Sequence, residues 1–549
     1  MIQQSTYFMQ EPGYRTRRGR RGSREKTGEL GRTIATERFP NTADEFWMSV
    51  NPGSVINPYD FVTVEQIHDT KTVGMVKELL AIDLVGLVAK IVVMANIGIE
   101  DDDKRDDSKK NNDNPSGKYR TVSMPVGGGR PVRFSDEKEV IFALGIPEMV
   151  APVPSGIIEM SNGLRVPISL DTSYLLGPDT AHVNAAGISG NQKTSYLLFL
   201  LQATYQRLVQ DAAVVIFNTK EQDLLHLDRK DAKVEGKNKS LHDLLGLKIE
   251  PFSNVSYFLP RGSDGRPNSA FVPENSRTYS FELGDVYDRL DLLFDMQDRQ
   301  HNISSIINYL YEAWPALSDS RKVNGWKDLL AFKDYPEEVV PLKGTVIHFL
   351  GSLQRILKSP MFTDRKVRST YLGKQIMGLG RGDVFVIDIA MLPTVEEQGF
   401  VVGDVMKSID LLYSSAMRQD EDTLRPKFIL IFIDEINRFV PRLQQGNNQI
   451  SPVADQIMRP VVTGRSRGTI LFSAQQFKSA LNPSFHENIG MHTIAKLGAS
   501  ELSTDPYRML DESTKKSIVR LNSGELIMVH PAFRHPIKVI FPRSPFRSG

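Results

Sequence analysis

The strongest constraint on the fold is a continuous apolar run, Phe428–Ile433, that ends directly in two carboxylates, Asp434 and Glu435. The run does not alternate between apolar and polar residues, so a strand formed from it would be covered on both faces, as in a parallel sheet. Three further runs have this character, and helical patterns occur along the chain between them: 213–217, 384–388 and 469–473. The sequence therefore predicts an α/β fold with a mainly parallel sheet and helices on both faces.

The two carboxylates after this run are difficult to explain as core residues. In a parallel sheet the carboxyl end of each strand faces the ligand crevice. We predict that Asp434 holds the water shell of Mg²⁺ and that Glu435 polarises a water for attack on a γ-phosphate. The alternative is a strand that runs into a polar turn, with both carboxylates simply solvated. Asp388, at the end of another run, is assigned no role and is interpreted as a solvated or capping carboxylate.

A glycine-containing segment, 187–194, predicts a phosphate-binding loop because it lies between the strand-like 182–186 and the apolar helix 195–208. In this order the loop N–H groups and the helix N-terminus face an anion, Lys193 reaches the β/γ-phosphates, and Thr194 offers its hydroxyl to Mg²⁺. The general pattern has glycine where this chain has Gln192, so a turn that only resembles such a loop remains the alternative. The predicted nucleotide-binding residues are Gly187, Ser189, Gly190, Asn191, Gln192, Lys193, Thr194 and Ser195.

The run 469–473 continues into Gln475, whose amide is placed to sense a γ-phosphate or the attacking water if its strand lies between the two motif strands. A polar strand end is the alternative interpretation. Just upstream, Arg459, Arg465 and Arg467 are candidates to reach a nucleotide bound to a neighbouring subunit and to stabilise transition-state charge there. From the sequence alone, a basic surface loop is the better explanation of these arginines.

The first third of the chain has a different pattern. Residues 1–40 are rich in Arg and Gly and lack apolar periodicity, which predicts a disordered tail, either without a role or acting on nucleic-acid phosphates. Four short β-type runs separated by Gly and Pro then predict a small β-barrel, and the polar stretch 100–118 predicts an exposed loop. The runs are 61–64, 84–97, 140–144 and 156–160.

Composition excludes several classes of site. The chain contains no Cys, so disulfides, thiolate metal sites and cysteine nucleophiles are excluded. The net charge is +1, so nucleic-acid binding would depend on local patches. The start lacks a signal-like pattern, and the most apolar stretch, 79–97, carries Asp83 and Lys90, so we expect a cytoplasmic protein with no membrane span.

Several segments together resemble the HerA-like branch of the HerA/FtsK ATPases, which are hexameric P-loop motors acting on DNA. Residues 432–441, Phe-Ile-Asp-Glu-Ile-Asn-Arg-Phe-Val-Pro, are similar to the family's Walker B block. Supporting segments occur in the family's order: 215–225, 251–258, 464–465 and 470–476. The resemblance covers about residues 165–545, and the β-rich segment before it matches the family's N-terminal barrel in position.

The resemblance implies a RecA-like P-loop ATPase core with an inserted helical bundle, assembled as a ring with ATP sites between subunits. It matches Lys193 and Thr194 to Walker A, Asp434 and Glu435 to Walker B and the catalytic carboxylate, Gln475 to the sensor, and Arg465 to the trans-acting arginine. The resulting domain prediction is a basic tail at 1–45, a β-barrel at 46–168, a first RecA-like core segment at 169–283, a helical insertion at 284–370, a second core segment at 371–500 and a C-terminal brace at 501–549.

Members of this family commonly work with a second protein, so an effector in trans is expected here, either a nuclease or a sirtuin-type NADase as in antiphage systems. The first functional hypothesis is a homo-hexameric ATP- and Mg²⁺-dependent translocase or helicase-type motor on duplex DNA. The second is a low-turnover nucleotide-binding ring that scaffolds and regulates the effector, which Gln192 favours. A P-loop kinase or GTPase is a weaker third, because no guanine-reading motif or small-substrate lid is present.

Overall fold

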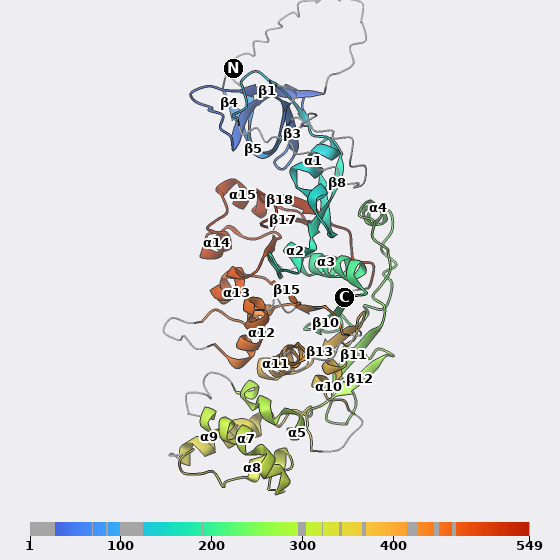
Figure 1. Ribbon diagram of the computed structural model, residues 1–549, viewed down its shortest axis with the longest axis vertical. Helices are drawn as coiled ribbons and strands as arrows, with labels where there is room; N and C mark the ends of the chain where they lie inside the picture. The colour runs from blue at the N-terminus through green and yellow to red at the C-terminus, as the bar shows by residue number, and fades with distance from the viewer. Residues whose placement is uncertain are drawn as a thin grey trace, which may run out of the picture.

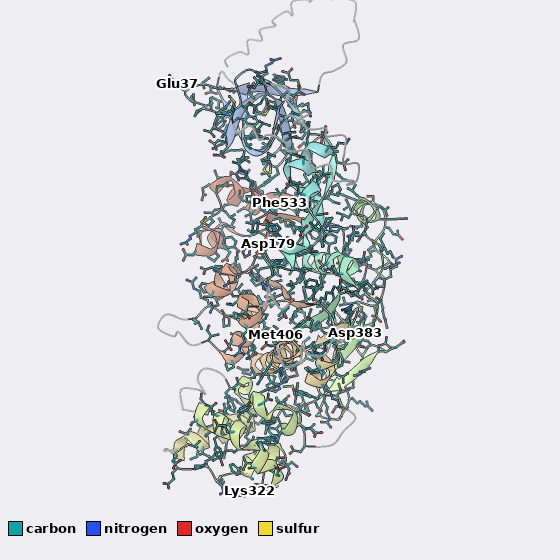
Figure 2. The ribbon with its side chains drawn as sticks, viewed as in Figure 1. Glu37, Asp179, Lys322, Asp383, Met406 and Phe533 are labelled. Atoms are coloured by element: carbon teal, nitrogen blue, oxygen red, sulfur yellow. The ribbon has the colours of Figure 1, made fainter. Side chains whose placement is uncertain are left out.

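A computed structural model describes residues 28–67, 70–83, 86–98, 124–188, 190, 192–294, 303–320, 322–339, 343–364, 369–413, 425–443, 450–463 and 468–547. The molecule is elongated, with a β-barrel at one end, a large sheet covered by helices in the middle and a group of helices at the other end (Figure 1). In Figure 2, Glu37 lies at the barrel end and Lys322 at the helical end, and side chains fill the layers between them.

In the described portion of the chain, six antiparallel strands form a closed barrel in the order β1-β2-β5-β4-β3-β6. The strands are β1 (Glu29–Ile34), β2 (Glu45–Val50), β3 (Phe61–Glu65), β4 (Lys71–Ile82), β5 (Gly86–Ile97) and β6 (Pro131–Phe134). The apolar stretch 79–97 thus lies in the β4–β5 hairpin. No helix among the described residues is both long enough and apolar enough to cross a membrane.

The barrel begins earlier than the sequence indicates, because β1 lies inside the predicted tail 1–45 and closes the barrel between β2 and β6. Only Leu30 and Ile34 are large apolar residues in this strand, so its pattern is too short to be recognised. Gly31 permits the pairing, since a Cβ there would lie 1.8 Å from the carbonyl oxygen of Ser49. The rest of the tail, 1–27, and the loop predicted at 100–118 lie outside the described residues.

Two runs that the sequence assigns to the barrel have other positions. The run 140–144 is not a strand but forms most of helix α1 (Glu137–Ala143). A capping box fixes the start of this helix: Asp136 accepts from the Glu139 backbone N–H, and the Glu139 side chain accepts from the Asp136 N–H. The run 156–160 is a strand, but it pairs within the large sheet and not in the barrel.

Twelve strands of the described chain form one mixed sheet in the order β12-β11-β13-β10-β14-β15-β9-β16-β17-β18-β7-β8. All neighbours from β12 to β16 are parallel, and the remaining pairs are antiparallel. The strands are β7 (Pro152–Glu159), β8 (Arg165–Asp171), β9 (Val183–Ala186), β10 (Ala212–Asn218), β11 (Val255–Pro260), β12 (Ser276–Tyr279), β13 (Val384–Asp388), β14 (Phe428–Ile433), β15 (Thr469–Gln475), β16 (Met491–Ile494), β17 (Glu525–Val529) and β18 (Ile537–Ile540).

The central strands are apolar on both faces because each face has its own core. On β14, Leu430 and Phe432 pack into the core that contains α3, while Ile429, Ile431 and Ile433 pack into the core that contains α11 and α12. This is the alternation of a strand buried on both sides. The predicted α/β fold class, with a mainly parallel sheet, inserted helices and a preceding small β-barrel, is confirmed.

Helices cover both faces of the sheet and form the inserted group between β12 and β13 (Figure 1). On the sheet and at its edges lie α2 (Thr172–Leu175), α3 (Lys193–Leu208), α4 (Lys237–Leu244), α10 (Leu372–Met377), α11 (Val395–Leu412), α12 (Pro452–Thr463), η8 (Lys478–Ala480), α13 (Pro483–Glu487), α14 (Ala499–Leu502), η9 (Asp505–Tyr507) and α15 (Glu512–Arg520). The inserted group contains α5 (Leu283–Val286), η4 (Tyr287–Leu293), α7 (Ile303–Asp319), α8 (Trp326–Ala331) and α9 (Lys343–Ile356).

A buried ion pair connects the inserted group to the sheet layer. Arg289 on η4 places its Nη1 2.6 Å from Oδ1 of Asp404 on α11, and both side chains are buried. Burial raises the pKa of Asp404 to about 6 even though the Arg289 charge acts in the opposite direction. The contact fixes the start of the insertion against α11.

Candidate nucleotide-binding site

The strand order brings the two sequence motifs to one edge of the sheet. Strand β9 leads into the glycine-containing loop, β14 ends at Asp434, and β15 lies between them and pairs in parallel with both. Because parallel strands have their carboxyl ends at the same edge, the loop, the acidic pair and the end of β15 meet there. The strand that carries Gln475 thus lies between the two motif strands, which is the placement its predicted sensor role requires.

The loop has the conformation that its glycines permit. Gly187 lies against Ala495, because a Cβ at 187 would be 2.8 Å from the Ala495 Cβ, and Gly190 has φ +82°. Gln192, immediately before helix α3, also lies in the left-handed region, with φ 59° and ψ 23°. Gln192 thus has the left-handed backbone conformation that glycine usually provides at this position. Because Gln192 has a Cβ, this conformation is sterically strained.

The remaining predicted loop residues divide into two groups. Lys193, Thr194 and Ser195 form the first turn of α3, and Lys193 is buried there. Ser189 and Asn191 lie outside the described residues, so their predicted contacts to phosphate stay predictions.

Polar contacts connect the first turn of α3 to the acidic pair. The Thr194 hydroxyl donates to Asp434 Oδ2 at 3.0 Å, and Lys193 Nζ lies 3.9 Å from Glu435 Oε1. Glu435 has φ 53°, and its backbone N–H donates to Asp434 Oδ1 at 2.9 Å. This left-handed turn directs the Glu435 side chain towards Lys193 instead of continuing the strand.

Lys220, which the sequence motifs do not assign to the site, lies within it. It follows β10, the other neighbour of β14, and its Nζ is 3.0 Å from Asp434 Oδ2 and 3.0 Å from Glu435 Oε1. Partial burial opposes its charge, but the adjacent Asp434 carboxylate raises the pKa of Lys220 above its ordinary value. In the sequence, Lys220 is recognisable as a lysine directly after a buried strand. The pairing of β10 with β14 is what places this lysine beside the acidic pair.

The oxygens of Thr194 and Asp434 fit a magnesium ion, since Mg²⁺ prefers hydroxyl, carboxylate and phosphate oxygens. Within the described ranges, no three His, Cys, Asp or Glu side chains cluster as a protein-only metal site. This agrees with a metal held by one or two protein oxygens together with substrate phosphates. Two carboxylates here face two ammonium groups, so the protein groups alone balance their charges.

Gln475 is fully buried and paired with an amide that the sequence motifs do not identify. Asn184 on β9 donates to Gln475 Oε1 at 2.7 Å, and Gln475 Nε2 donates to Asn184 Oδ1 at 2.8 Å. This reciprocal pair joins β9 to β15 directly behind the loop. The sensor role of Gln475 stays a prediction. For that role, the Gln475 amide would have to break its hydrogen bonds to Asn184 or act on the nucleotide through Asn184.

The other predicted charged residues have different positions. Arg459 on α12 is exposed and pairs with Asp455 at 2.9 Å, whereas Arg465 and Arg467 lie outside the described residues. Asp388 is fully buried, so the interpretation of a solvated carboxylate is wrong. It accepts hydrogen bonds from Asn218, Ser269 and the Ala390 backbone, which fits the capping interpretation, and burial raises its pKa.

Neither protein-family models nor curated protein sequences match this chain. Among solved structures, it is similar to VirB4 of Thermoanaerobacter pseudethanolicus (16% identity, 72% of this chain and 97% of that chain, TM-score 0.43). It is also similar to the bacterial conjugative coupling protein TrwBΔN70 (13%, 72% and 91%, 0.44). A third is the genome packaging NTPase B204 of Sulfolobus turreted icosahedral virus 2 in complex with ATP-γ-S (12%, 32% and 72%, 0.23). At these values the likeness identifies neither a family nor an activity.

Proposed function

We propose that this chain is an ATP hydrolase of the P-loop type that works with Mg²⁺. The observation that carries the proposal is the Thr194–Asp434 hydrogen bond of 3.0 Å. It joins the first turn of the helix after the loop to the acidic end of a strand two positions away in the sheet. Several groups then meet at one sheet edge: a helix N-terminus, a lysine, a hydroxyl and two carboxylates. These are the groups that bind nucleotide phosphates and their metal.

In the proposed reaction each side chain has one task. Lys193 binds the β/γ-phosphate oxygens, and Thr194 and Asp434 would hold Mg²⁺, which supplies neutralisation of phosphate charge when bound. Glu435 orients a water and takes its proton as the water oxygen bonds to the γ-phosphorus. The bond from this phosphorus to the β–γ bridging oxygen breaks, giving ADP and phosphate. Lys220 holds the Glu435 carboxylate in position through an ion pair of 3.0 Å to Oε1.

We further propose the motor interpretation: a homo-hexameric HerA-like translocase or helicase-type ring on duplex DNA, working with an effector nuclease or sirtuin-type NADase in antiphage defence. Its support is the resemblance of residues 432–441 and of the segments around them. Arg459, Arg465 and Arg467 remain the candidates for the residue that acts in trans. DNA contacts would be directed at phosphates and therefore sensitive to salt.

The second candidate function is a low-turnover ring that scaffolds the effector. Two observations favour it: Gln192 holds a strained left-handed conformation, and the Gln475 amide is engaged by Asn184. Both features would slow a catalytic cycle without preventing nucleotide binding. Cytoplasmic location belongs to either proposal.

The test is steady-state ATP hydrolysis with Mg²⁺, with and without linear duplex DNA. We compare the unaltered chain with Glu435→Gln, which keeps the side-chain size, and with Glu512→Gln, a matched control on α15 whose carboxylate is exposed. Turnover that Glu435→Gln abolishes, Glu512→Gln preserves and DNA accelerates supports the motor. Turnover at the Glu435→Gln level in every condition refutes the hydrolase, and ATP-γ-S binding by the same samples then tests the scaffold.

A further inference from the structure

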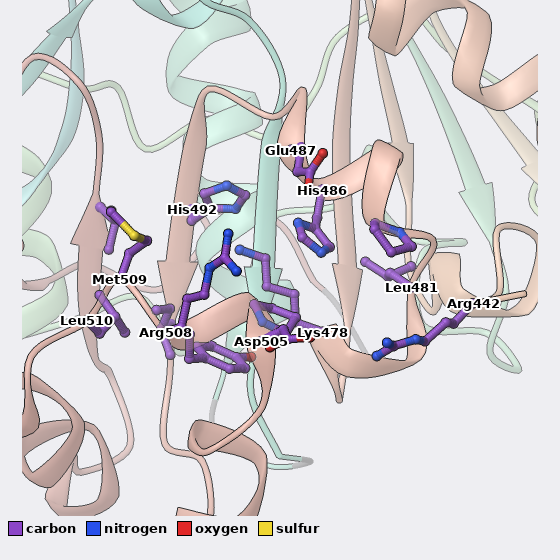
Figure 3. A pocket seen from close by; sticks show the side chains of 15 residues that line it. Arg442, Lys478, Leu481, His486, Glu487, His492, Asp505, Arg508, Met509 and Leu510 are labelled. Carbon is purple, nitrogen blue, oxygen red and sulfur yellow. The ribbon is translucent and has the colours of Figure 1, made fainter. Parts of the chain in front are cut away.

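A second pocket, separate from the loop and the acidic pair, lies beyond the end of β15. It has a volume of about 370 Å³ and is formed by η8, α13, β16 and the turn at η9. Figure 3 shows Lys478, Arg508, His486 and His492 directed into a common space from these elements. Pockets of a few hundred Å³ are of the size that small ligands fill.

Lys478 is the central feature of this pocket. Its side chain is 5% exposed, and within the described residues its ammonium has no hydrogen bond and no ion pair. The ammonium lies instead over the ring of Tyr507, whose centroid is 5.9 Å from Nζ. Burial lowers the pKa of Lys478 to about 8. The side chain is thus largely withdrawn from water while its ammonium faces the pocket, and an anion bound there would offset the cost of this burial.

Two arginines add positive charge to the same pocket. Arg442 and Arg508 line it, both are exposed, and neither forms an ion pair in the portion of the chain that the structure describes. The pocket's carboxylates, Glu487 and Asp505, are exposed and likewise unpaired there. The pocket thus contains three basic side chains and two carboxylates. Of these five groups, the buried one is the basic side chain of Lys478.

The two histidines supply neutral donors or acceptors. Burial lowers the pKa of His486, and the charge of Lys478 acts in the same direction. Burial lowers the pKa of His492 further, and its Nδ1 is buried with no hydrogen-bond partner in the described residues. His492 therefore brings an unsatisfied polar atom to the pocket, near enough to Lys478 for the lysine charge to lower the histidine pKa, and a ligand oxygen could accept hydrogen bonds from both groups.

The remaining lining is apolar, provided by Leu481, Pro483, Ile494, Tyr507, Met509 and Leu510. Met509 is 89% exposed at the pocket and offers an uncovered apolar surface. This combination suits a ligand with an anionic end and an apolar or aromatic body. Two cations, the Lys478 ammonium and the planar guanidinium fork of Arg508, match a phosphate dianion better than a single carboxylate.

We propose that this pocket binds a small phosphate monoester with an aromatic or apolar body, its phosphate between Lys478, Arg508 and His492. The site goes beyond the proposed ATPase and uses none of the residues assigned to it. It does adjoin that site, since Lys478 follows β15 and His492 lies on β16, which pairs with β9.

The test titrates phenyl phosphate into the full chain by calorimetry, without nucleotide or Mg²⁺. We expect saturable binding that Lys478→Met weakens about tenfold or more, because a charge-assisted hydrogen bond is lost. Arg508→Gln should weaken it severalfold, whereas Arg520→Gln, an exposed arginine on α15, should have no effect. Lys193→Met should bind phenyl phosphate normally, which separates this pocket from the candidate nucleotide site and from failure of the proposed ATPase.

A folding control comes with the same variants. Removing a buried unpaired charge should raise the thermal midpoint of ligand-free Lys478→Met, so loss of binding is not explained by unfolding. If benzoate binds as tightly as phenyl phosphate, the pocket does not select a phosphate over a carboxylate, and the proposal is overturned. The proposal is also overturned if phenyl phosphate does not bind, if Lys478→Met binds it normally, or if Lys193→Met abolishes binding.

Discussion

The left-handed conformation of Gln192 leads to a quantitative prediction about stability. Glycine adopts φ 59° and ψ 23° without steric cost, whereas a residue with a Cβ loses roughly 1–2 kcal/mol there. Glycine in turn loses roughly 0.5–1 kcal/mol of additional backbone entropy on folding. The difference favours glycine, and we expect Gln192→Gly to be more stable than Gln192→Ala by about 1 kcal/mol.

The comparison of Gly with Ala at one position isolates the backbone. Both variants remove the Gln192 side chain beyond Cβ, including its amide, so the difference between them reports on the backbone conformation. For a folding unit as large as the sheet domain, which extends from Pro152 to Ile540, about 1 kcal/mol corresponds to roughly 1 °C in the thermal midpoint. The assay is thermal unfolding followed by circular dichroism at one protein concentration.

The reasoning would be refuted by equal midpoints for the two variants, or by a higher midpoint for Gln192→Ala. Either result would mean that the loop leaves the left-handed conformation once the Gln192 side chain is removed. A large loss of stability in both variants would show instead that interactions of the Gln192 amide matter more than the backbone strain.

Two further predictions concern charged groups. Although burial opposes ionisation of Glu139, the hydrogen bonds from Arg133 and other donors lower its pKa from 4.5 to about 2. With allowance for screening by solvent, these hydrogen bonds should stabilise the fold by roughly 1–2 kcal/mol above pH 4.5, and the contribution should disappear as the pH falls towards 2. Glu139→Gln should remove that pH dependence, measured by urea unfolding at a series of pH values; an unchanged pH profile contradicts the assignment. In the candidate site, Lys220→Met should lower kcat for ATP about 10- to 100-fold while Lys220→Arg retains most of it, because Glu435 loses the cation that orients it. Steady-state hydrolysis measures this, and equal rates for the two variants would exclude the positioning role.

Local sequence patterns were sufficient where burial leaves a clear signature. The run 428–433 is apolar at every position because both of its faces are covered, so the strand and its type could be predicted without tertiary information. The run 140–144 has the same residue types but becomes helical, since the capping box at Asp136 and Glu139 provides local hydrogen bonds that a strand would not. Whether a short run of β-prone residues forms a strand or a helix therefore depends on its flanking residues.

The candidate site could be predicted only incompletely, for a related physical reason. The loop and the acidic pair are each contiguous in sequence, so their residues could be named in advance. Lys220 and Asn184 act through neighbours that are distant in sequence: Lys220 through the β10–β14 pairing, and Asn184 through the β15–β9 pairing. No periodicity or spacing encodes such a pairing.

The buried central strands and the charged loops beside them follow from the amino-acid order alone, because hydrophobic pattern and turn chemistry act over a few residues. The tertiary structure decided the strand order, and with it that Thr194 and Asp434, 240 residues apart, form one hydrogen bond. It also placed Lys478 in a pocket where, among the described residues, no carboxylate pairs with it. Strand order follows from the burial of whole faces against one another, and that free energy depends on contacts between segments far apart in the chain.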